Sequence, residues 1–275
     1  MIDIDLFEYT SEQKEKATYP SQEPRKGFFT DTTLCIGCKA CEVACKEWNQ
    51  IPADGYEFTG TSYDNTGELS GETWRHVAMV EQKHNGSIRW LMESDVCKHC
   101  THAACLDVCP TGALIRTEFG TVMVQDDVCN GCGYCVPACP FGVLTKREDN
   151  HRAAKCTLFY DRLKENDTPA CAKACPTHSI QFGDVDELRQ RADERLEKVR
   201  REPQFVGARL YGRNEADGVG GAGAFFLLLD KPEVYGLPPA PVDTTRDLGK
   251  MYRVMGIAAG ALVGAMTLAA IGSKR

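Results

Sequence analysis

The stretch Cys129-Asn-Gly-Cys132-Gly-Tyr-Cys135-Val-Pro-Ala-Cys139-Pro140 places four cysteines within eleven residues and follows the last one with proline. Cysteines three positions apart in a tight loop direct their sulfurs toward one point, so three thiolates can bind one inorganic cluster. The fourth cysteine lies about one helical turn further on, a rise of roughly 6 Å, and its sulfur points away from that cluster. In such runs the last cysteine binds the other cluster of a pair. The stretch therefore predicts two interlocked iron–sulfur clusters.

Three further cysteine groups occur along the chain: Cys35-x2-Cys38-x2-Cys41-x3-Cys45, Cys97-x2-Cys100-x4-Cys105-x3-Cys109, and Cys156 followed by Cys171-x3-Cys175. The second and third groups are complete and adjacent in sequence, so we predict that they form one pair and that the first and fourth form another. The predicted sites are Cys35, Cys38, Cys41 and Cys175 (site 1); Cys97, Cys100, Cys105 and Cys139 (site 2); Cys129, Cys132, Cys135 and Cys109 (site 3); and Cys156, Cys171 and Cys45 (site 4).

Site 4 lacks one thiolate. The position three after Cys156, where the pattern places a cysteine, is Phe159, and a phenyl ring cannot bind iron. Three outcomes remain open: a three-iron cluster, a four-iron cluster completed by water or Asp161, or no cluster. If a cluster forms, the loss of one negative thiolate is expected to raise its reduction potential. The sequence therefore predicts three [4Fe-4S] clusters and a fourth site of undecided content.

Two other uses of cysteine fit less well. Disulfides are disfavoured because fifteen cysteines is an odd number and the acidic start of the chain carries no signal-peptide pattern. Structural zinc sites use two cysteine pairs separated by a longer spacer, unlike these compact runs, although a zinc-binding structural protein remains the second hypothesis. His99 and His102 lie inside the second group, whose four cysteines already complete a set. They are predicted to donate hydrogen bonds to cluster sulfurs or to face solvent.

Composition narrows the functional class. The chain has 275 residues, 43% hydrophobic and 26% charged, which is sufficient for a folded core. A formal net charge of −7 argues against nucleic acid as a partner. The sequence has no phosphate loop, dinucleotide fingerprint or nucleophile–base arrangement. Electron transfer without catalysis by this chain itself is the expected role.

The segments around the cysteines predict mixed secondary structure. Residues 76–81 and 87–92 flank Asn85-Gly86 as a β-hairpin, and residues 113–116 and 121–124 form a second hairpin. Asp184 is expected to cap a helix that carries an apolar stripe from Val185 to Val199. The apolar residues 224–229 are predicted to form a buried strand. Residues 51–71 are expected to form a long loop, and the proline-rich residues 237–241 a stiff linker.

Residues 254–271 contain no charge over 18 residues, about 27 Å as a helix, which is enough to cross a hydrocarbon core. Gly256, Gly260 and Gly264 recur every four residues and could let another membrane helix approach closely. Basic residues flank both ends, so the positive-inside rule does not orient the segment. A single C-terminal transmembrane helix is predicted.

These features predict an α+β fold with two ferredoxin-like pseudo-repeats that bind paired iron–sulfur clusters, β-hairpin inserts and the C-terminal transmembrane helix. The expected divisions are an N-terminal arm (1–30), an outer cluster-pair domain (31–95 with 145–183), an inner cluster-pair domain (96–144), a helix and strand extension with a linker (184–245) and the anchor (246–275).

With these motifs the chain resembles the electron-transfer (beta) subunits of molybdopterin oxidoreductases, and most of all those of respiratory formate dehydrogenase. The resemblance is carried by residues 35–49, 129–141, Lys155-Cys-Thr-Leu158 and 169–177, and in the tail by Asp217-Gly-Val-Gly-Gly221 and Val234-Tyr-Gly-Leu-Pro238. It covers residues from about 30 to the end. Phe159 is the departure, because the family pattern has a cysteine there.

The resemblance implies a specific role. A large molybdopterin catalytic (alpha) subunit would oxidise formate, and this chain would relay the electrons to a cytochrome b membrane (gamma) subunit and then to quinone. The chain would be anchored in the cell membrane by its helix, with its cluster domain outside the cytoplasm. The alternative is the same relay role for a nitrate, polysulfide or sulfoxide reductase.

Overall fold

A four-stranded sheet forms the centre of the larger part of the molecule in this computed structural model, which describes residues 24–53, 55, 58–84 and 86–272. Its strand order is β8-β1-β10-β9, with β1 at Lys26–Asp31, β8 at Ile180–Asp184, β9 at Arg209–Tyr211 and β10 at Ala224–Leu228. Strand β1 runs parallel to β10 and antiparallel to β8. Strand β10 is buried along its length, as its uninterrupted apolar sequence predicts.

Strand β1 corrects the predicted N-terminal arm. Residues 26–30 form a core strand, with Phe28 and Phe29 fully buried on opposite faces of the sheet. Residues 1–23 of the predicted arm lie outside the described residues. The alternation of Phe28 and Phe29 allows one short strand to contribute to two cores, one beside the cysteines and one beneath a helix.

Helix α7 (Val185–Arg200) covers that second face. Its buried residues Val185, Leu188, Ala192 and Val199 belong to the predicted stripe, so the amphipathic prediction is confirmed. The predicted side-chain cap is wrong. Asp184 occupies the N-cap position, but its carboxylate accepts a hydrogen bond from Lys26 Nζ at 2.5 Å instead of capping the helix. An ion pair between neighbouring strands replaces the cap.

Both predicted hairpins are confirmed. Strands β2 (Arg75–His84) and β3 (Ser87–Val96) pair antiparallel over their whole length, and β4 (Leu114–Arg116) pairs with β5 (Val122–Val124). Residue 85 of the first turn lies outside the described residues. A third, two-residue ladder joins β6 (Thr145–Lys146) to β7 (Ala153–Ala154). Residues 51–71 contain no helix or strand where they are described, as expected.

Short helices follow the cysteine loops. They are α2 (Ala40–Asn49), α3 (Ala104–Asp107), α4 (Cys135–Ala138), α5 (Tyr160–Lys164) and α6 (Ala170–Lys173), with 3-10 turns η1 (Pro203–Phe205) and η2 (Pro232–Tyr235) later in the chain. Helix α2 of the first group packs against α6 of the fourth, and α3 of the second group packs against α4 of the third. The mixed helix and strand content confirms the α+β class.

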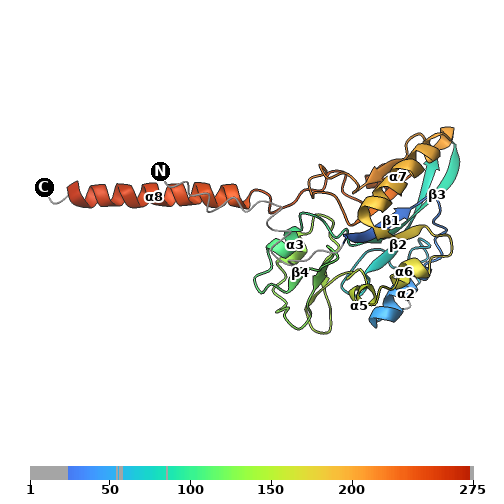
Figure 1. Cartoon of the computed structure of the whole chain (residues 1–275), viewed down its shortest axis with the longest axis horizontal. Coiled ribbons are helices and arrows are strands. Elements are labelled where there is room, and N and C mark those ends of the chain that lie inside the picture. The colour runs from blue at the N-terminus through green and yellow to red at the C-terminus, as the bar shows by residue number, and fades with distance from the viewer. Residues whose placement is uncertain (1–23, 54, 56–57, 85, 273–275) are drawn as a thin grey trace.

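Helix α8 (Leu248–Gly272) projects away from the rest of the molecule (Figure 1). Residues 248–271 have a mean hydropathy of 2.1 over their most apolar window and bury none of that window against the chain. The helix is long and apolar enough to cross a membrane.

Candidate metal centres

The same backbone turn recurs in all four cysteine loops. The residue two positions after the first cysteine has a positive φ in every group: Gly37 (66°), His99 (44°), Gly131 (73°) and Leu158 (57°). Glycine tolerates this conformation, whereas the other two residues adopt it at a steric cost. The fourth loop therefore keeps the turn of the other three even though it has lost one cysteine.

The structure brings the thiols of each predicted site together. Burial, with smaller contributions from neighbouring thiols, raises the pKa of the Cys35 thiol to about 11 and that of the Cys135 thiol to about 11. Burial likewise raises the pKa of Cys100 and Cys45. In each predicted site, the pKa of one thiol is raised by the other thiols of the same site. Cys35 is affected by Cys38, Cys41 and Cys175, and Cys100 by Cys97, Cys105 and Cys139. Cys135 is affected by Cys109, Cys129 and Cys132, and Cys45 by Cys156 and Cys171.

Polar hydrogens point at several of these sulfurs. The backbone N–H groups of Leu158 and Ala153 donate to Cys156 Sγ (3.3 Å) and Cys129 Sγ (3.5 Å). Ser94 Oγ lies 3.3 Å from Cys41 Sγ, and Asn49 Nδ2 donates to Cys45 Sγ at 3.7 Å. Hydrogen bonds of this kind stabilise thiolates and raise the reduction potential of a bound cluster.

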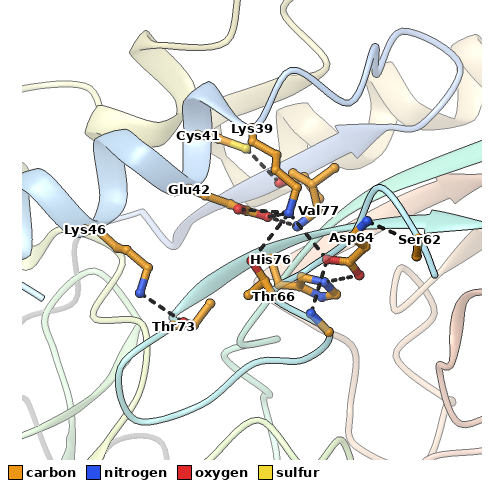
Figure 2. Close-up of polar contacts among 12 residues, drawn as sticks. Lys39, Cys41, Glu42, Lys46, Ser62, Asp64, Thr66, Thr73, His76 and Val77 are labelled. Carbon is orange, nitrogen blue, oxygen red and sulfur yellow. Dashed lines mark hydrogen bonds and ion pairs between the residues drawn. The ribbon is translucent and has the colours of Figure 1, made fainter. Parts of the chain in front are cut away.

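A polar network holds the chain over site 1 (Figure 2). Lys39, between Cys38 and Cys41, lies 3.3 Å from both Glu42 and Asp64. The Asp64 carboxylate is also 2.7 Å from His76 Nε2, and Glu42 accepts a hydrogen bond from the backbone N–H of Val77. The first cysteine loop, the long loop and strand β2 are thus tied together beside the site.

The donor set and its spacing fit polynuclear iron–sulfur clusters. Cys35, Cys38, Cys41 and Cys175 line one small cavity, together with three aliphatic side chains, three hydroxyl side chains and Lys39. Among the described residues, no three cysteine, histidine, aspartate or glutamate side chains lie close enough together to bind a single metal ion. Structural zinc sites use two cysteine pairs separated by a longer spacer, so compact runs of four cysteines suit a polynuclear cluster better than a single ion.

Comparisons with known proteins agree with this geometry. Two profiles, each described as a 4Fe-4S dicluster domain, match residues 34–113 and 88–185. The chain is 40% identical over 228 residues to the iron–sulfur subunit of the nitrate-inducible formate dehydrogenase of Escherichia coli (strain K12), which covers 80% of this chain and 75% of that protein. This chain belongs to the family of formate dehydrogenase iron–sulfur subunits.

Other members of the wider group align to differing extents. The formate dehydrogenase iron–sulfur subunit of Haemophilus influenzae is 39% identical over 239 residues, covering 84% of this chain and 75% of its own. The B subunit of the anaerobic dimethyl sulfoxide reductase of E. coli is 38% identical over 165 residues, covering 60% of this chain and 76% of its own. As a formate dehydrogenase iron–sulfur subunit, the chain transfers electrons and is not the catalytic subunit, which confirms the role predicted from its cysteines.

Phe159 is buried in the hydrophobic core and not at the surface. Its side chain is 1% exposed and belongs to the same buried cluster as Cys45, Cys156 and Cys171. Asp161, which the sequence offered as a replacement ligand, is exposed, and its carboxylate accepts a hydrogen bond from Trp48 Nε1 at 2.7 Å. The structure therefore buries the phenyl ring of Phe159 in the core cluster that also contains these three thiols, and it leaves the Asp161 carboxylate at the surface.

His99 corrects one of the two predicted alternatives. It is fully buried and does not face solvent, and its Nδ1 accepts a hydrogen bond from the backbone N–H of Val122 at 3.1 Å. The proton is therefore on Nε2, which has no hydrogen-bond partner among the described residues. Burial, together with the neighbouring Lys155, lowers the pKa of His99 well below its ordinary value.

Two buried cations that lie among the thiols were not predicted from the sequence. Arg75 is 1% exposed and lies among thiols of sites 1 and 4, while Lys155 is 2% exposed and lies among Cys97, Cys105 and Cys156. Arg75 lies outside every cysteine run, so no motif indicates it. Lys155 precedes Cys156 directly, and its position next to a cysteine was the one available signal.

Proposed function

We propose that the chain relays electrons in a membrane-bound formate dehydrogenase complex, between a large molybdopterin catalytic subunit and a cytochrome b membrane subunit that delivers them to quinone. Iron–sulfur clusters supply one-electron redox chemistry at sites lined by thiolates. The observation that carries the proposal is the set of thiols that neighbour one another around Cys35, Cys45, Cys100 and Cys135, which supports the predicted four sites. Relatives named as formate dehydrogenase subunits favour formate over the sulfoxide reductase alternative because they align with more of the chain.

Electrostatic influences between thiols of different sets support a single order of the sites along the electron-transfer path. Cys45 of site 4 neighbours Cys41 of site 1, and Cys156 of site 4 neighbours Cys97 of site 2. Cys105 of site 2 in turn neighbours Cys135 of site 3. This gives the order 1, 4, 2, 3, and it makes site 4 the second centre.

The two ends of this series reach the surface. Cys38 of site 1 and Cys132 of site 3 are exposed, whereas Cys156 and Cys171 of site 4 are buried. Exposed ends allow partner subunits to approach sites 1 and 3 closely, and the buried middle keeps solvent away. The catalytic subunit would bind over site 1 and the membrane subunit near site 3.

Site 4 is proposed to hold a [3Fe-4S] cluster, beside three [4Fe-4S] clusters at sites 1 to 3. Cys45, Cys156 and Cys171 provide three ligands. Phe159 is buried and offers no ligand atom for the remaining corner, and the Asp161 carboxylate is engaged by Trp48. A corner without a ligand does not retain a fourth iron, so the three-iron form is favoured over the other two outcomes.

Helix α8 is proposed as the anchor in the cell membrane, with the cluster domain on the extracytoplasmic side. Its residues are exposed along the helix, and a Cβ added at Gly256, Gly260 or Gly264 would meet no other atom of the chain. That glycine face is therefore free to contact a helix of the membrane subunit.

The proposal is tested on the complex purified anaerobically from membranes. Chemical analysis is expected to find fifteen iron atoms and sixteen inorganic sulfides per chain, as three four-iron clusters and one three-iron cluster require. Formate added to the complex should reduce the clusters and then a quinone analogue. Absence of iron and sulfide would disprove the relay, and full reduction by another substrate but not by formate would reassign the complex.

A further inference from the structure

Arg75 is a buried charge without a counter-charge from the protein. The side chain is 1% exposed, and among the described residues it forms no ion pair with a carboxylate. Its Nη1 donates to the backbone oxygen of Ser94 at 3.3 Å and to Ser94 Oγ at 3.0 Å, while Nη2 is buried with no hydrogen-bond partner. Such a group is strongly unfavourable unless a negative charge lies beside it.

The missing negative charge can come from sites 1 and 4. The charges that act on Arg75 are those of Cys171, Cys41, Cys156 and Cys45, one thiol of site 1 and all three of site 4. Ser94 Oγ, to which Arg75 Nη1 donates, lies 3.3 Å from Cys41 Sγ. The guanidinium carbon stands 4.9 Å from the centre of the Phe28 ring, a cation–π contact that helps to hold the side chain in place. Arg75 is thus held at the junction between the two sites.

We propose that Arg75 is a shared positioning residue for sites 1 and 4, whose buried positive charge raises the reduction potentials of both centres. The inference rests on the relay function, since it presumes clusters in both sites. Each reduction adds one electron, and so one negative charge, beside a guanidinium that remains protonated. A nearby cation favours that reduction, because their attraction is screened weakly inside the protein. No proton is taken up or released by Arg75.

The test compares Arg75→Met, Arg75→Lys and wild type in the intact complex by redox titration followed with electron paramagnetic resonance. In Arg75→Met the one-electron reduction equilibrium constants of sites 1 and 4 are expected to fall about tenfold, which is about 59 mV. The three-iron signal reports site 4, and one of the three four-iron transitions should move with it. Arg75→Lys retains the charge and should restore most of the shift.

Arg162→Met is the matched control. Arg162 is also buried, but its guanidinium lies 4.2 Å from the Trp48 ring centre, and its Nε donates to the Thr168 backbone oxygen at 2.7 Å. This variant should leave all four transitions in place. Arg75→Met with full iron content and unshifted transitions, or with four equal shifts, would overturn the inference while leaving the relay intact.

A second measurement covers the case in which Arg75→Met fails to retain iron. In wild type labelled with ¹⁵N-arginine, pulsed paramagnetic resonance should detect a ¹⁵N coupling to the three-iron centre of site 4. Absence of this coupling in a complex with its full iron complement would overturn the role of Arg75. Absence of iron from the wild-type complex would instead disprove the relay itself.

Discussion

Single side chains decide what each cysteine loop can hold. Phe159 follows a loop whose turn at Leu158 matches those at Gly37 and Gly131, so the fourth loop is shaped like the others. Phe159 itself has a φ of 56°, a conformation that costs a residue with a Cβ about 1 to 2 kcal/mol. The backbone therefore accepts this cost at the position where the cysteine spacing of the other loops predicts a ligand.

Replacing Phe159 with cysteine tests whether this residue limits site 4 to three thiolate ligands. In Phe159→Cys a fourth thiolate becomes available, so iron is expected to rise by one atom per chain and the three-iron signal of the oxidised protein to disappear. The reduction potential of site 4 should fall because a negative charge is added. Iron analysis and paramagnetic resonance measure both effects.

Asp161→Asn is the control for that experiment. Its carboxylate accepts a hydrogen bond from Trp48 and is exposed, so removing its charge should change neither the iron content nor the signal. Loss of the three-iron signal in this variant, or its persistence in Phe159→Cys, would contradict the assignment of site 4.

At the scale of elements, the sheet depends on how closely β1 approaches its neighbours. Gly27 and Gly183 face each other across β1 and β8, yet their surroundings differ. A Cβ at Gly27 would lie only 2.0 Å from the Gly223 backbone oxygen, whereas one at Gly183 would lie 3.8 Å from Leu188. The first glycine is required by packing and the second is not.

Alanine at each position gives a matched pair. Gly27→Ala is expected to destabilise the chain by about 2 kcal/mol because backbone must move to make room. Gly183→Ala should be close to neutral. The rate at which urea bleaches the visible absorbance of the purified protein measures the difference, and equal rates for the two variants would refute this account of the sheet.

The long loop is held to site 1 through Asp64. Burial alone would raise the pKa of this carboxyl, but the Gly67 backbone N–H and the side chains of His76 and Lys39 outweigh burial and lower it. A lowered folded-state pKa means that the carboxylate stabilises the fold above its ordinary pKa near 4 and that this contribution is lost as pH falls through the folded value.

Asp64→Asn should therefore destabilise the chain by about 1 kcal/mol near neutral pH and by progressively less in acid. The difference between wild type and variant in the rate of cluster bleaching, followed from pH 7 downward, measures this change. Asp126→Asn, which breaks an exposed ion pair with Arg152 at 3.5 Å, is the control and should have little effect. A difference that grows in acid would contradict the assigned direction.

At the scale of the whole molecule, the cluster body and helix α8 are separate in their packing. No residue in the most apolar window of the predicted membrane span is buried against the body, so removal of the span exposes no core (Figure 1). Deleting residues 246–275 from the chain expressed without its partners should leave its iron content unchanged and move it from the membrane fraction to the soluble one. A shortened chain that still sediments with membranes would argue against α8 as the anchor.

The β2–β3 and β4–β5 hairpins, the buried strand β10 and the apolar C-terminal helix could be predicted from the sequence, because these features depend on local spacing and periodicity. Only the tertiary structure placed β1 in the centre of the sheet, turned Asp184 to Lys26 and brought Arg75 between two sites distant in sequence. Those outcomes depend on which strands become neighbours and on which charges are buried together. Short-range patterns carry no record of such long-range contacts.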